Sequence, residues 1–443
     1  MGDPQFAKYP DLQLAQHIFH ISNPSSSRVV KQSSLRSLHD AITKYKMAPL
    51  YRHLAHPTEG IMNTSGETAE HQVGHALRRT SSSAATLLAS RRPSLDVTLT
   101  WDETLYDKLR EDNEKELEAI QKEQDEAVEK AGETEIQAAK GKRAEFFTRV
   151  GEKVSELHGF HRSTILIVAL QERAIDAYEV VFENTNILGA KIDIVLAIIR
   201  IGIFFGDRAL VKKQIDRAGS LVESGGDWDR RNRLKAYHGL HLLTVRSYAA
   251  AAPLLLDSLS TFTSYELCNY SSLVVYAVLA GSVSLKRVDF KTRVVDAPEI
   301  KAILGEGEDK LSALSGKISA GPSVEDAEMQ DAQPSTQAPT AVNLTILGQS
   351  STLQQEEEAQ VNFKPLANLV TSLYKGDYRS FFTALGKVEE NFLSQDRYLA
   401  EHRQWYVREM RLRGYQQLLQ SYSKVGLESM ANDFGVSVDF LDK

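Results

Sequence analysis

The middle of the chain contains a helical repeat, and this repeat restricts the fold more than any other feature. Two segments, "DIVLAIIRIGIFFGDRALVKKQIDRAGSLV" and "LKAYHGLHLLTVRSYAAAAPLLLDSLSTF", each carry an amphipathic helix with a small residue at its centre, a short turn and a second helix. A third segment repeats the pattern, and the small residues Gly202, Gly239 and Ala277 lie 37 and 38 residues apart. Helix pairs with this period predict an all-α fold, a right-handed α-solenoid of hairpins similar to tetratricopeptide repeats.

The overall charge and the single cysteine exclude several classes of protein. The 443 residues carry 52 Lys and Arg against 59 Asp and Glu, a formal net charge of -7, which disfavours a global attraction to nucleic acid or to an anionic membrane. Cys268 is the only cysteine, so neither an intramolecular disulfide nor a zinc site built from cysteines can form. The N-terminus lacks a basic region followed by an apolar run, and no apolar stretch approaches the roughly 20 residues that span a bilayer. We therefore expect a protein of the cytoplasm and nucleus with no membrane partner.

A highly charged helix is predicted from Trp101 to Lys140. Its apolar stripe is thin and is flanked by Glu and Lys at i,i+4 distances, which favour an exposed helix. The stripe consists of Leu105, Leu109, Leu117, Ile120 and Val128. It never completes three clean heptads, so the pattern favours a long solvated helix lying on the body of the protein over a coiled coil.

An earlier repeat is visible but interrupted. "AEFFTRVGEKV" resembles its first helix and "ERAIDAYEVVFENT" its second, while the 17 residues "SELHGFHRSTILIVALQ", 155–171, separate them. The distance from Gly151 to Gly202 is 51 residues, and removing those 17 leaves 34, close to the repeat period. We interpret 155–171 as a late insertion or a retained intron that puts an apolar run where a short turn belongs.

The motifs of the common catalytic classes do not occur. "GEGEDKLS" lacks the G-K-[ST] ending of a phosphate-binding loop, and no G-x-S-x-G is present. Metal sites favour histidines at i,i+4 with a glutamate, whereas the pairs here are three residues apart. These pairs are His17/His20, His158/His161 and His238/His241. Cys268 lies beside apolar residues and is interpreted as a buried structural thiol. We expect no enzyme, no metal and no cofactor.

The run "GGDWDRRNRLKAY" lies between the second helix of one repeat and the first helix of the next. Its two glycines are expected to end one helix through a left-handed C-cap, and Asp227 or Asp229 to cap the next. The cations then lie on or near the first helical turn, where the helix dipole disfavours positive charge. They are therefore expected to bind either nearby carboxylates or a partner.

Three interpretations of this run remain open. The first is structural, with caps, internal ion pairs and Trp228 packed between repeats. The second is a contact with a partner protein. The third, a nucleic-acid surface, would need basic and aromatic residues along several repeats, which the neighbouring repeats do not supply. The candidate contact residues are Asp227, Trp228, Asp229, Arg230, Arg231 and Arg233.

The last segment, "VGLESMANDFGVSVDFLDK", is typical of the start of a winged helix. Leu427, Met430 and Ala431 are predicted to point inward, followed by a turn at Gly435. The candidate residues of this winged-helix start are Leu427, Met430, Ala431, Phe434 and Val436. The sequence stops after two helices at most, so an incomplete winged helix without its β-wing is expected. Intact mass, or a reading frame extended past Lys443, tests this expectation.

Four long stretches together resemble one protein family. "KIDIVLAIIRIGIFFGD", "GGDWDRRNRLKAYHGL", "STFTSYEL" and "WYVREMRLRGYQQLLQSY" closely resemble the subunit 7 family of the proteasome regulatory-particle lid, which are non-ATPase, PCI-domain proteins. The resemblance covers about 102–149, 172–300 and 363–441. "GDWDRRNRLK" favours this family over the related signalosome subunit.

The resemblance implies a scaffold, an α-solenoid that ends in a PCI domain whose winged helix pairs with neighbours in a horseshoe. It implies contacts with lid subunits 3 and 6, with the ATPase ring and with a small acidic tether protein. It does not imply deubiquitinase activity. The alternative functions are a PCI scaffold of the signalosome or of translation initiation factor three. A nucleic-acid-binding PCI protein would need a basic winged helix, whereas Asp433, Asp439 and Asp442 occur here.

The repeat, the composition shifts and the resemblance together divide the chain. Two segments, one rich in Ser, Thr and Arg and one rich in Pro, Ser, Gln and acid, are predicted to be disordered inserts. The predicted divisions are an N-terminal helical segment, the first insert, the charged helix and solenoid, the second insert, and the PCI helices with an incomplete winged helix, at 1–59, 60–100, 101–304, 305–361 and 362–443.

Overall fold

The computed structural model is all-helical over the residues that it describes. These are 6–57, Gly60, Met62, 99–130, 132–150, 162–305, 361–420 and 424–441, and no strand occurs among them. Both predicted inserts, 60–100 and 305–361, lie almost entirely outside this part of the chain, as does 155–161 of the predicted insertion.

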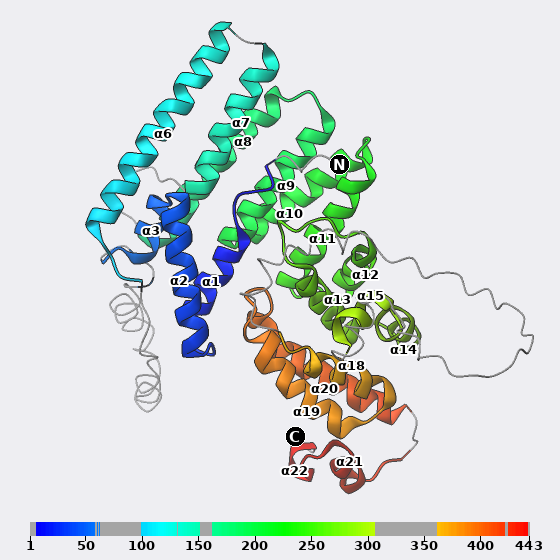
Figure 1. Cartoon of the computed structure of the whole chain (residues 1–443). Helices are drawn as coiled ribbons and strands as arrows, with labels where there is room; N and C mark the ends of the chain where they lie inside the picture. The colour runs from blue at the N-terminus through cyan, green and yellow to red at the C-terminus, as the bar shows by residue number, and fades with distance from the viewer. Residues whose placement is uncertain are drawn as a thin grey trace, which may run out of the picture.

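The helices of the N-terminal half run as follows. They are α1 (Leu12–Ser22), α2 (Arg28–Tyr45), α3 (Ala48–Ala55), α6 (Glu103–Lys130), α7 (Glu133–Val150), α8 (Arg162–Asn184), α9 (Leu188–Phe205), α10 (Arg208–Glu223) and α11 (Trp228–Thr244). The second half continues the stack and ends in a smaller group of helices (Figure 1). They are α12 (Tyr248–Ser258), α13 (Tyr270–Ser284), α14 (Arg287–Phe290), α15 (Pro298–Leu304), α18 (Lys364–Lys375), α19 (Tyr378–Val388), α20 (Arg403–Leu419), α21 (Leu427–Phe434) and α22 (Val438–Leu441).

The charged segment forms two helices, not the single helix that was predicted. α6 ends at Lys130 and α7 begins at Glu133, with Gly132 between them. Glycine is a poor helix former, and its presence here is consistent with the reversal of the chain. α6 and α7 lie side by side and project beyond the rest of the chain (Figure 1). The Arg149 guanidinium lies 2.7 Å from the Glu116 carboxylate, so the two helices are joined by charge as well as by the thin apolar stripe.

The solenoid is built from antiparallel helix pairs that approach closely at glycine. A Cβ added at Gly202 on α9 would lie 2.7 Å from Val211 on α10, and one at Gly239 on α11 would lie 2.6 Å from Leu255 on α12. Neither position can hold a larger side chain without movement of its neighbour. In the third repeat the close approach is made by Gly281, whose added Cβ would meet Val294 at 2.8 Å. Ala277, the predicted small residue, is buried in the core but does not carry this contact.

The described part of the predicted insertion is helical. Residues 162–171 form the first turns of α8, which continues without a break to Asn184 and packs against α7 and α9. The apolar run "ILIVAL" therefore lies in a helix and not in a turn.

The PCI-side helices share one core with the solenoid. Buried side chains of α9 to α13 and of α18 to α20 form a single cluster. Several hydrogen bonds cross this boundary. Among them, the Tyr406 hydroxyl donates to the Leu279 carbonyl oxygen at 3.1 Å, and the Tyr276 hydroxyl donates to Asp396 Oδ2 at 2.6 Å. The end of the solenoid thus positions the segment that leads into α20.

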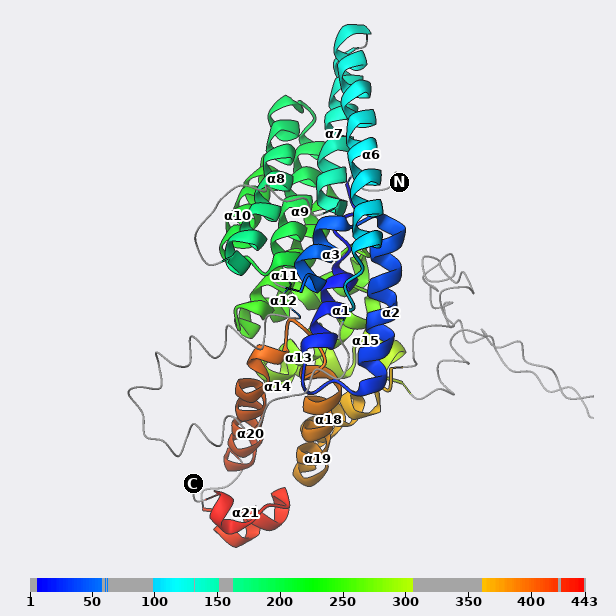
Figure 2. The ribbon, with the colours of Figure 1, turned by 90° about the vertical axis from the view of Figure 1, so that its left-hand side faces the viewer.

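The N-terminal segment crosses the molecule and joins distant parts of it. Figure 2 shows α1 to α3 across the face of the stack, with α18 and α20 below them. The Asn23 side chain donates to the Ser394 carbonyl oxygen at 2.7 Å, and Gln16 Nε2 donates to the Gln395 carbonyl oxygen at 2.7 Å. α1 therefore fixes the segment before α20 from the opposite end of the chain.

Within the described residues, no helix combines the length and the apolar character that a bilayer crossing requires. The handedness predicted for the solenoid stays a prediction.

Candidate functional site

The seam between the helix pairs α9–α10 and α11–α12 begins with two glycines and a capping aspartate. α10 ends at Ser224 in a right-handed conformation, so the predicted left-handed C-cap is wrong. Gly225 has φ +146, which residues with a side chain rarely adopt, and a Cβ at Gly226 would lie 2.8 Å from Val222 Cα. Asp227 caps α11 by accepting from the Arg230 amide at 3.0 Å. The glycines therefore make a tight entry that places the arginines of α11 against α9.

Asp193 of α9 holds two arginines of α11. Its Oδ2 lies 2.5 Å from Arg230 Nη2, its Oδ1 accepts from Arg230 Nε at 3.1 Å, and Oδ1 also accepts from Arg233 Nη1 at 3.0 Å. The side chains of Asp193 and Arg233 are each 2% exposed, so this pair is removed from water. Arg230 also binds Asp227 at 2.6 Å. We call Asp193, Arg230, Arg233 and the residues bonded to them the seam network.

The seam network continues to the next helix pair through Glu266, which precedes α13. Glu266 Oε1 accepts from Arg233 Nη2 at 2.8 Å and from the Tyr237 hydroxyl at 2.8 Å. That hydroxyl accepts in turn from Arg200 Nη1 at 2.8 Å. Arg200 is fully buried and also donates to the carbonyl oxygens of the N-terminal segment. The network therefore links α9, α11, the loop before α13 and the N-terminus.

The electrostatics of the seam network favour its charged form. The hydrogen bond with Asp193 raises the pKa of Arg230 above its usual value. Burial alone would lower the pKa of Arg233, but Tyr237, Glu266 and Asp193 outweigh burial, so its pKa is raised. Burial raises the pKa of the Tyr237 hydroxyl, which keeps it protonated as a donor to Glu266. Each arginine thus stays charged and bound to carboxylates of its own chain.

The six candidate contact residues separate into inward and outward groups. Arg230 and Arg233 bind Asp193 and Glu266, and Asp229 accepts from the Thr263 hydroxyl at 2.9 Å. Asp227 is exposed but caps α11. Arg231 is exposed, and Trp228 is 60% exposed, so the interpretation in which this tryptophan packs between repeats is wrong. Trp228 and Arg231 are the members of the run that remain available to a partner.

The predicted start of a winged helix forms α21, packed on aromatic side chains of α19 and α20. The Phe434 ring stacks on Tyr378 at 4.7 Å and meets the edges of Phe382 and Tyr415 at 5.0 and 4.7 Å. Gly435 ends the helix with φ +66, as predicted for the turn. Of the five candidate residues of the winged-helix start, three are buried: Met430, Ala431 and Phe434. Val436 is partly buried, and Leu427 is 48% exposed. The prediction that Leu427 points inward is wrong, because its side chain is largely exposed at the first position of α21 and is not part of the cluster around Phe434.

The described residues contain no group of three or more His, Cys, Asp or Glu side chains that could hold a metal ion. His158 and His161 lie outside the described residues. Burial lowers the pKa of His17 and of His20, which favours neutral imidazoles. Burial also raises the pKa of the half-buried Cys268 thiol, as expected of a structural cysteine that is not a reactive thiolate.

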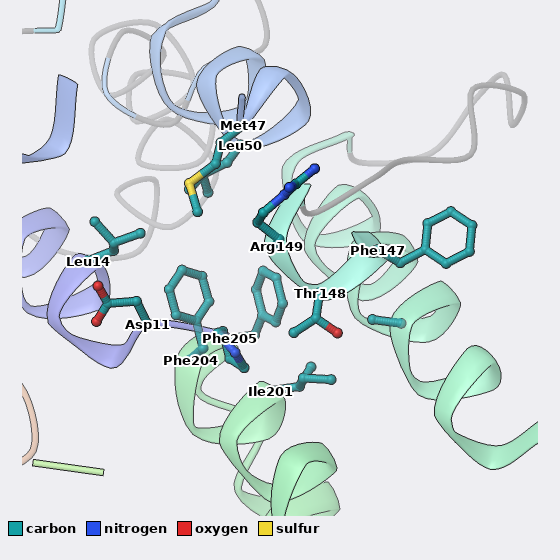
Figure 3. Close-up of a pocket in the computed structure, with 12 residues that line it drawn as sticks. Asp11, Leu14, Met47, Leu50, Phe147, Thr148, Arg149, Ile201, Phe204 and Phe205 are labelled. Carbon is teal, nitrogen blue, oxygen red and sulfur yellow. The ribbon is translucent and has the colours of Figure 1, made fainter. Parts of the chain in front are cut away.

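One pocket is mostly apolar and lies between the N-terminal segment with α1, α3, α7, α8 and the end of α9 (Figure 3). Its wall is formed by side chains such as Leu14, Met47 and Phe204, with Asp11 and Arg149 as its charged members. Arg149 is bound to Glu116. This pocket brings together no nucleophile and base, so it is better described as imperfect packing among these elements than as an active site.

Two comparisons with known proteins agree with the architecture. A family model described as 26S proteasome subunit RPN7 matches residues 102–164 and 166–293, and a PCI domain model matches 378–443. The 26S proteasome regulatory subunit rpn7 of Schizosaccharomyces pombe is 31% identical over 433 residues, which cover 98% of this chain and 82% of the relative. The chain belongs to the RPN7 family.

Other RPN7-family relatives show the same extent of similarity. The 26S proteasome non-ATPase regulatory subunit 6 of Dictyostelium discoideum is 34% identical over 344 residues, covering 78% of this chain and 70% of that protein. The RPN7 subunit of Saccharomyces cerevisiae is 29% identical over 442 residues, covering 99% and 82%. The RPN7 match includes α9 to α13 and hence the seam network, and the PCI match begins at α19.

Proposed function

We propose that this protein is a non-catalytic scaffold subunit of the proteasome regulatory-particle lid that supports assembly and ubiquitin-dependent protein degradation. The observation that carries the proposal is the occurrence of an RPN7 match over 102–293 and a PCI match over 378–443 on one chain. The seam network supports a structural role, because its cations are bound to carboxylates of the same chain and not presented to a substrate.

The partners that we propose are lid subunits, especially neighbours 3 and 6, together with the ATPase ring and a small acidic tether protein. The cytoplasm and the nucleus are the proposed locations. Purification of the full chain through an affinity tag, followed by mass spectrometry, tests the partners. The proposal expects lid and ATPase-ring subunits in the eluate. Recovery of signalosome or initiation-factor subunits in their place would contradict it.

We also propose that Trp228 and Arg231 contact a partner at the seam. Trp228 is a large apolar side chain held in water at the start of α11, and such residues often mark interfaces. Arg231 is exposed beside it and lies outside the seam network. Because the fold does not depend on either side chain, their replacement should weaken assembly while leaving the solenoid intact.

A matched control exists on the same helix. Val245, the C-cap of α11, is 41% exposed at the opposite end. We expect Trp228→Ala and Arg231→Ala to reduce recovery of lid subunits in the eluate, and Val245→Ala to leave it unchanged, with equal thermal stability in all three. Equal recovery from all three variants would contradict the contact.

For the C-terminal helices we propose that α21 is the first helix of a winged helix. The packing of Phe434 on α19 and α20 supports this, since it attaches α21 to the helical part of the PCI match. Phe434 and its aromatic neighbours would then set the orientation in which a winged helix meets neighbouring subunits.

A further inference from the structure

A second pocket, half-open to solvent, lies where the solenoid meets the segment before α20. The turn between α9 and α10 forms one wall, the C-terminal end of α11 forms another, and the segment at 397–398 forms the third. Its lining includes Gly206, Arg208, His241, Thr244, Arg397 and Tyr398. This pocket is separate from the seam network and from α21.

Arg397 brings a buried, unpaired donor to this pocket. Its Nη2 donates to the Phe204 carbonyl oxygen at 2.7 Å, while its Nη1 is buried and has no hydrogen-bond partner among the described residues. Its backbone amide donates to Gln16 Oε1 at 3.1 Å, so α1 holds the residue in place. Burial lowers the pKa of its guanidinium, although Tyr398 and the preceding carboxylate, Asp396, act in the opposite direction. The Asp396 carboxylate accepts hydrogen bonds from the Tyr276 hydroxyl and from the amides of Tyr398 and Leu399, so it is held by other donors. A buried donor left unpaired is costly, which points to a missing acceptor.

The backbone oxygens near Arg397 are already bound. The Phe204 carbonyl accepts from Arg397 itself, and the Thr244 carbonyl at the end of α11 accepts from His402 Nε2 at 2.9 Å. Neither carbonyl therefore competes for the free Nη1 group. The acceptor that Nη1 lacks has to come from outside these residues.

The carboxylates near the pocket are occupied as well. Asp207 caps α10 by accepting from the Leu210 amide at 2.9 Å. Glu401 is bound to Arg208, and the Arg208 hydrogen bond lowers the pKa of this carboxyl. The negative charge at the rim is thus held by groups other than Arg397.

Besides burial, cationic neighbours act on His241 at the same wall. Burial lowers the pKa of His241, and His238, Lys212 and Arg208 lower it further, with Asp216 acting in the opposite direction. The N-terminus of the 16-residue helix α10 also lies at this wall and adds the positive end of its dipole.

We propose that this pocket binds a single oxyanion, a carboxylate or a phosphate, through the free Nη1 group of Arg397. Guanidinium is the side chain best suited to such oxygens, because it stays charged and directs its N–H groups in a fixed plane. The ligand supplies the acceptor that Nη1 lacks. A carboxylate from an acidic partner segment and free phosphate share this chemistry.

The test uses the full chain with sodium phosphate and sodium acetate as probes, at an ionic strength held constant with sodium chloride. Calorimetric titration measures the affinity of each probe, and thermal unfolding measures the change in the midpoint of unfolding that the probe causes. We expect the midpoint of unfolding to rise by about 3–6 °C when the probe is present at about ten times its Kd, which corresponds to a stabilisation of roughly 1.4 kcal/mol. A response to phosphate alone identifies phosphate as the ligand. A response to acetate as well identifies a carboxylate ligand. Either result supports the site.

Variants separate this site from general anion effects. Arg397→Gln should abolish the response, and Arg397→Lys, which keeps a charge and a donor for Phe204, should weaken affinity by about tenfold. Arg403→Gln is the control, because Arg403 binds only the Ser25 hydroxyl at 3.3 Å and lies outside the pocket. The proposal is overturned if neither probe binds at about 50 mM, or if Arg397→Gln and Arg397→Lys respond as the unmodified chain does.

Discussion

Replacing Arg233 with alanine removes the side chain that joins three consecutive parts of the stack. Arg233 on α11 binds Asp193 on α9 and Glu266 before α13, at 3.0 and 2.8 Å. The substitution leaves both carboxylates in place with one fewer cation. Since the three side chains are only 2%, 2% and 6% exposed, water cannot replace the lost partner without local opening.

The size of the effect follows from this burial. Removing one partner of a buried ion pair costs about 3–5 kcal/mol. Asp193 keeps Arg230, and Glu266 keeps the Tyr237 hydroxyl, so the lower end of that range applies. For a cooperative unit of about 150–250 residues, a loss of about 3 kcal/mol lowers the midpoint of thermal unfolding by about 6–12 °C.

Circular dichroism of the full chain during heating measures this midpoint. Arg231→Ala is the matched control, because Arg231 is an exposed arginine of the same helix, and such surface substitutions change stability by about 0.5 kcal/mol or less. A second variant, Arg233→Met with Glu266→Leu, replaces one pair by apolar groups. We expect it to be less destabilising than Arg233→Ala, because it leaves one orphaned carboxylate fewer.

The reasoning fails on one clear outcome. If Arg233→Ala lowers the midpoint no more than Arg231→Ala does, the buried pairs contribute nothing to the stability of the stack.

Three further predictions follow from packing and protonation. Gly239→Ala should lower the free energy of unfolding, measured by urea titration, by about 1–3 kcal/mol, because the added Cβ would lie 2.6 Å from Leu255. Gly219→Ala is the control: no atom lies within 4 Å of the added Cβ, so this variant should raise the free energy of unfolding by up to about 1 kcal/mol. Phe434→Ala should speed amide exchange throughout α21, whereas Leu427→Ser, at an exposed position, should not. Four histidines have pKa values lowered from 6.5 in the folded protein, so they bind more protons in the unfolded state than in the folded state. The midpoint of thermal unfolding should therefore fall as the pH drops below about 6.5, and a midpoint that rises would contradict this. They are His17, His20, His238 and His241.

Local features of the seam could be predicted from the sequence because they depend on neighbours a few positions away. The cap at Asp227 and the need for glycine at the entry to α11 belong to this class, although the conformation of Gly225 is not the predicted one. The partners of Arg233 could not be predicted. Asp193 and Glu266 are 40 and 33 residues away, and only the register of the helix pairs brings them to α11.

The same distinction explains which predictions failed for α21, for the charged segment and for the pocket at Arg397. The helical spacing predicted that Met430 and Ala431 are buried, but it also placed Leu427 on the buried face, whereas Leu427 is exposed at the first position of α21. The charged segment was predicted as one helix because its polar, helix-favouring composition continues past Gly132, although that glycine marks the reversal into α7. The pocket at Arg397 joins segments 193 residues apart and has no local signal in the sequence.

The most direct test of the scaffold proposal removes the protein and measures the lid. The gene is switched off in cells, and lysates are separated on native gels with detection of a second lid subunit. A scaffold of the lid predicts that this subunit leaves the full-size lid and accumulates in smaller assemblies, and that the full chain supplied in trans restores the lid. Lids of unchanged size and amount after loss of the protein would contradict the central claim.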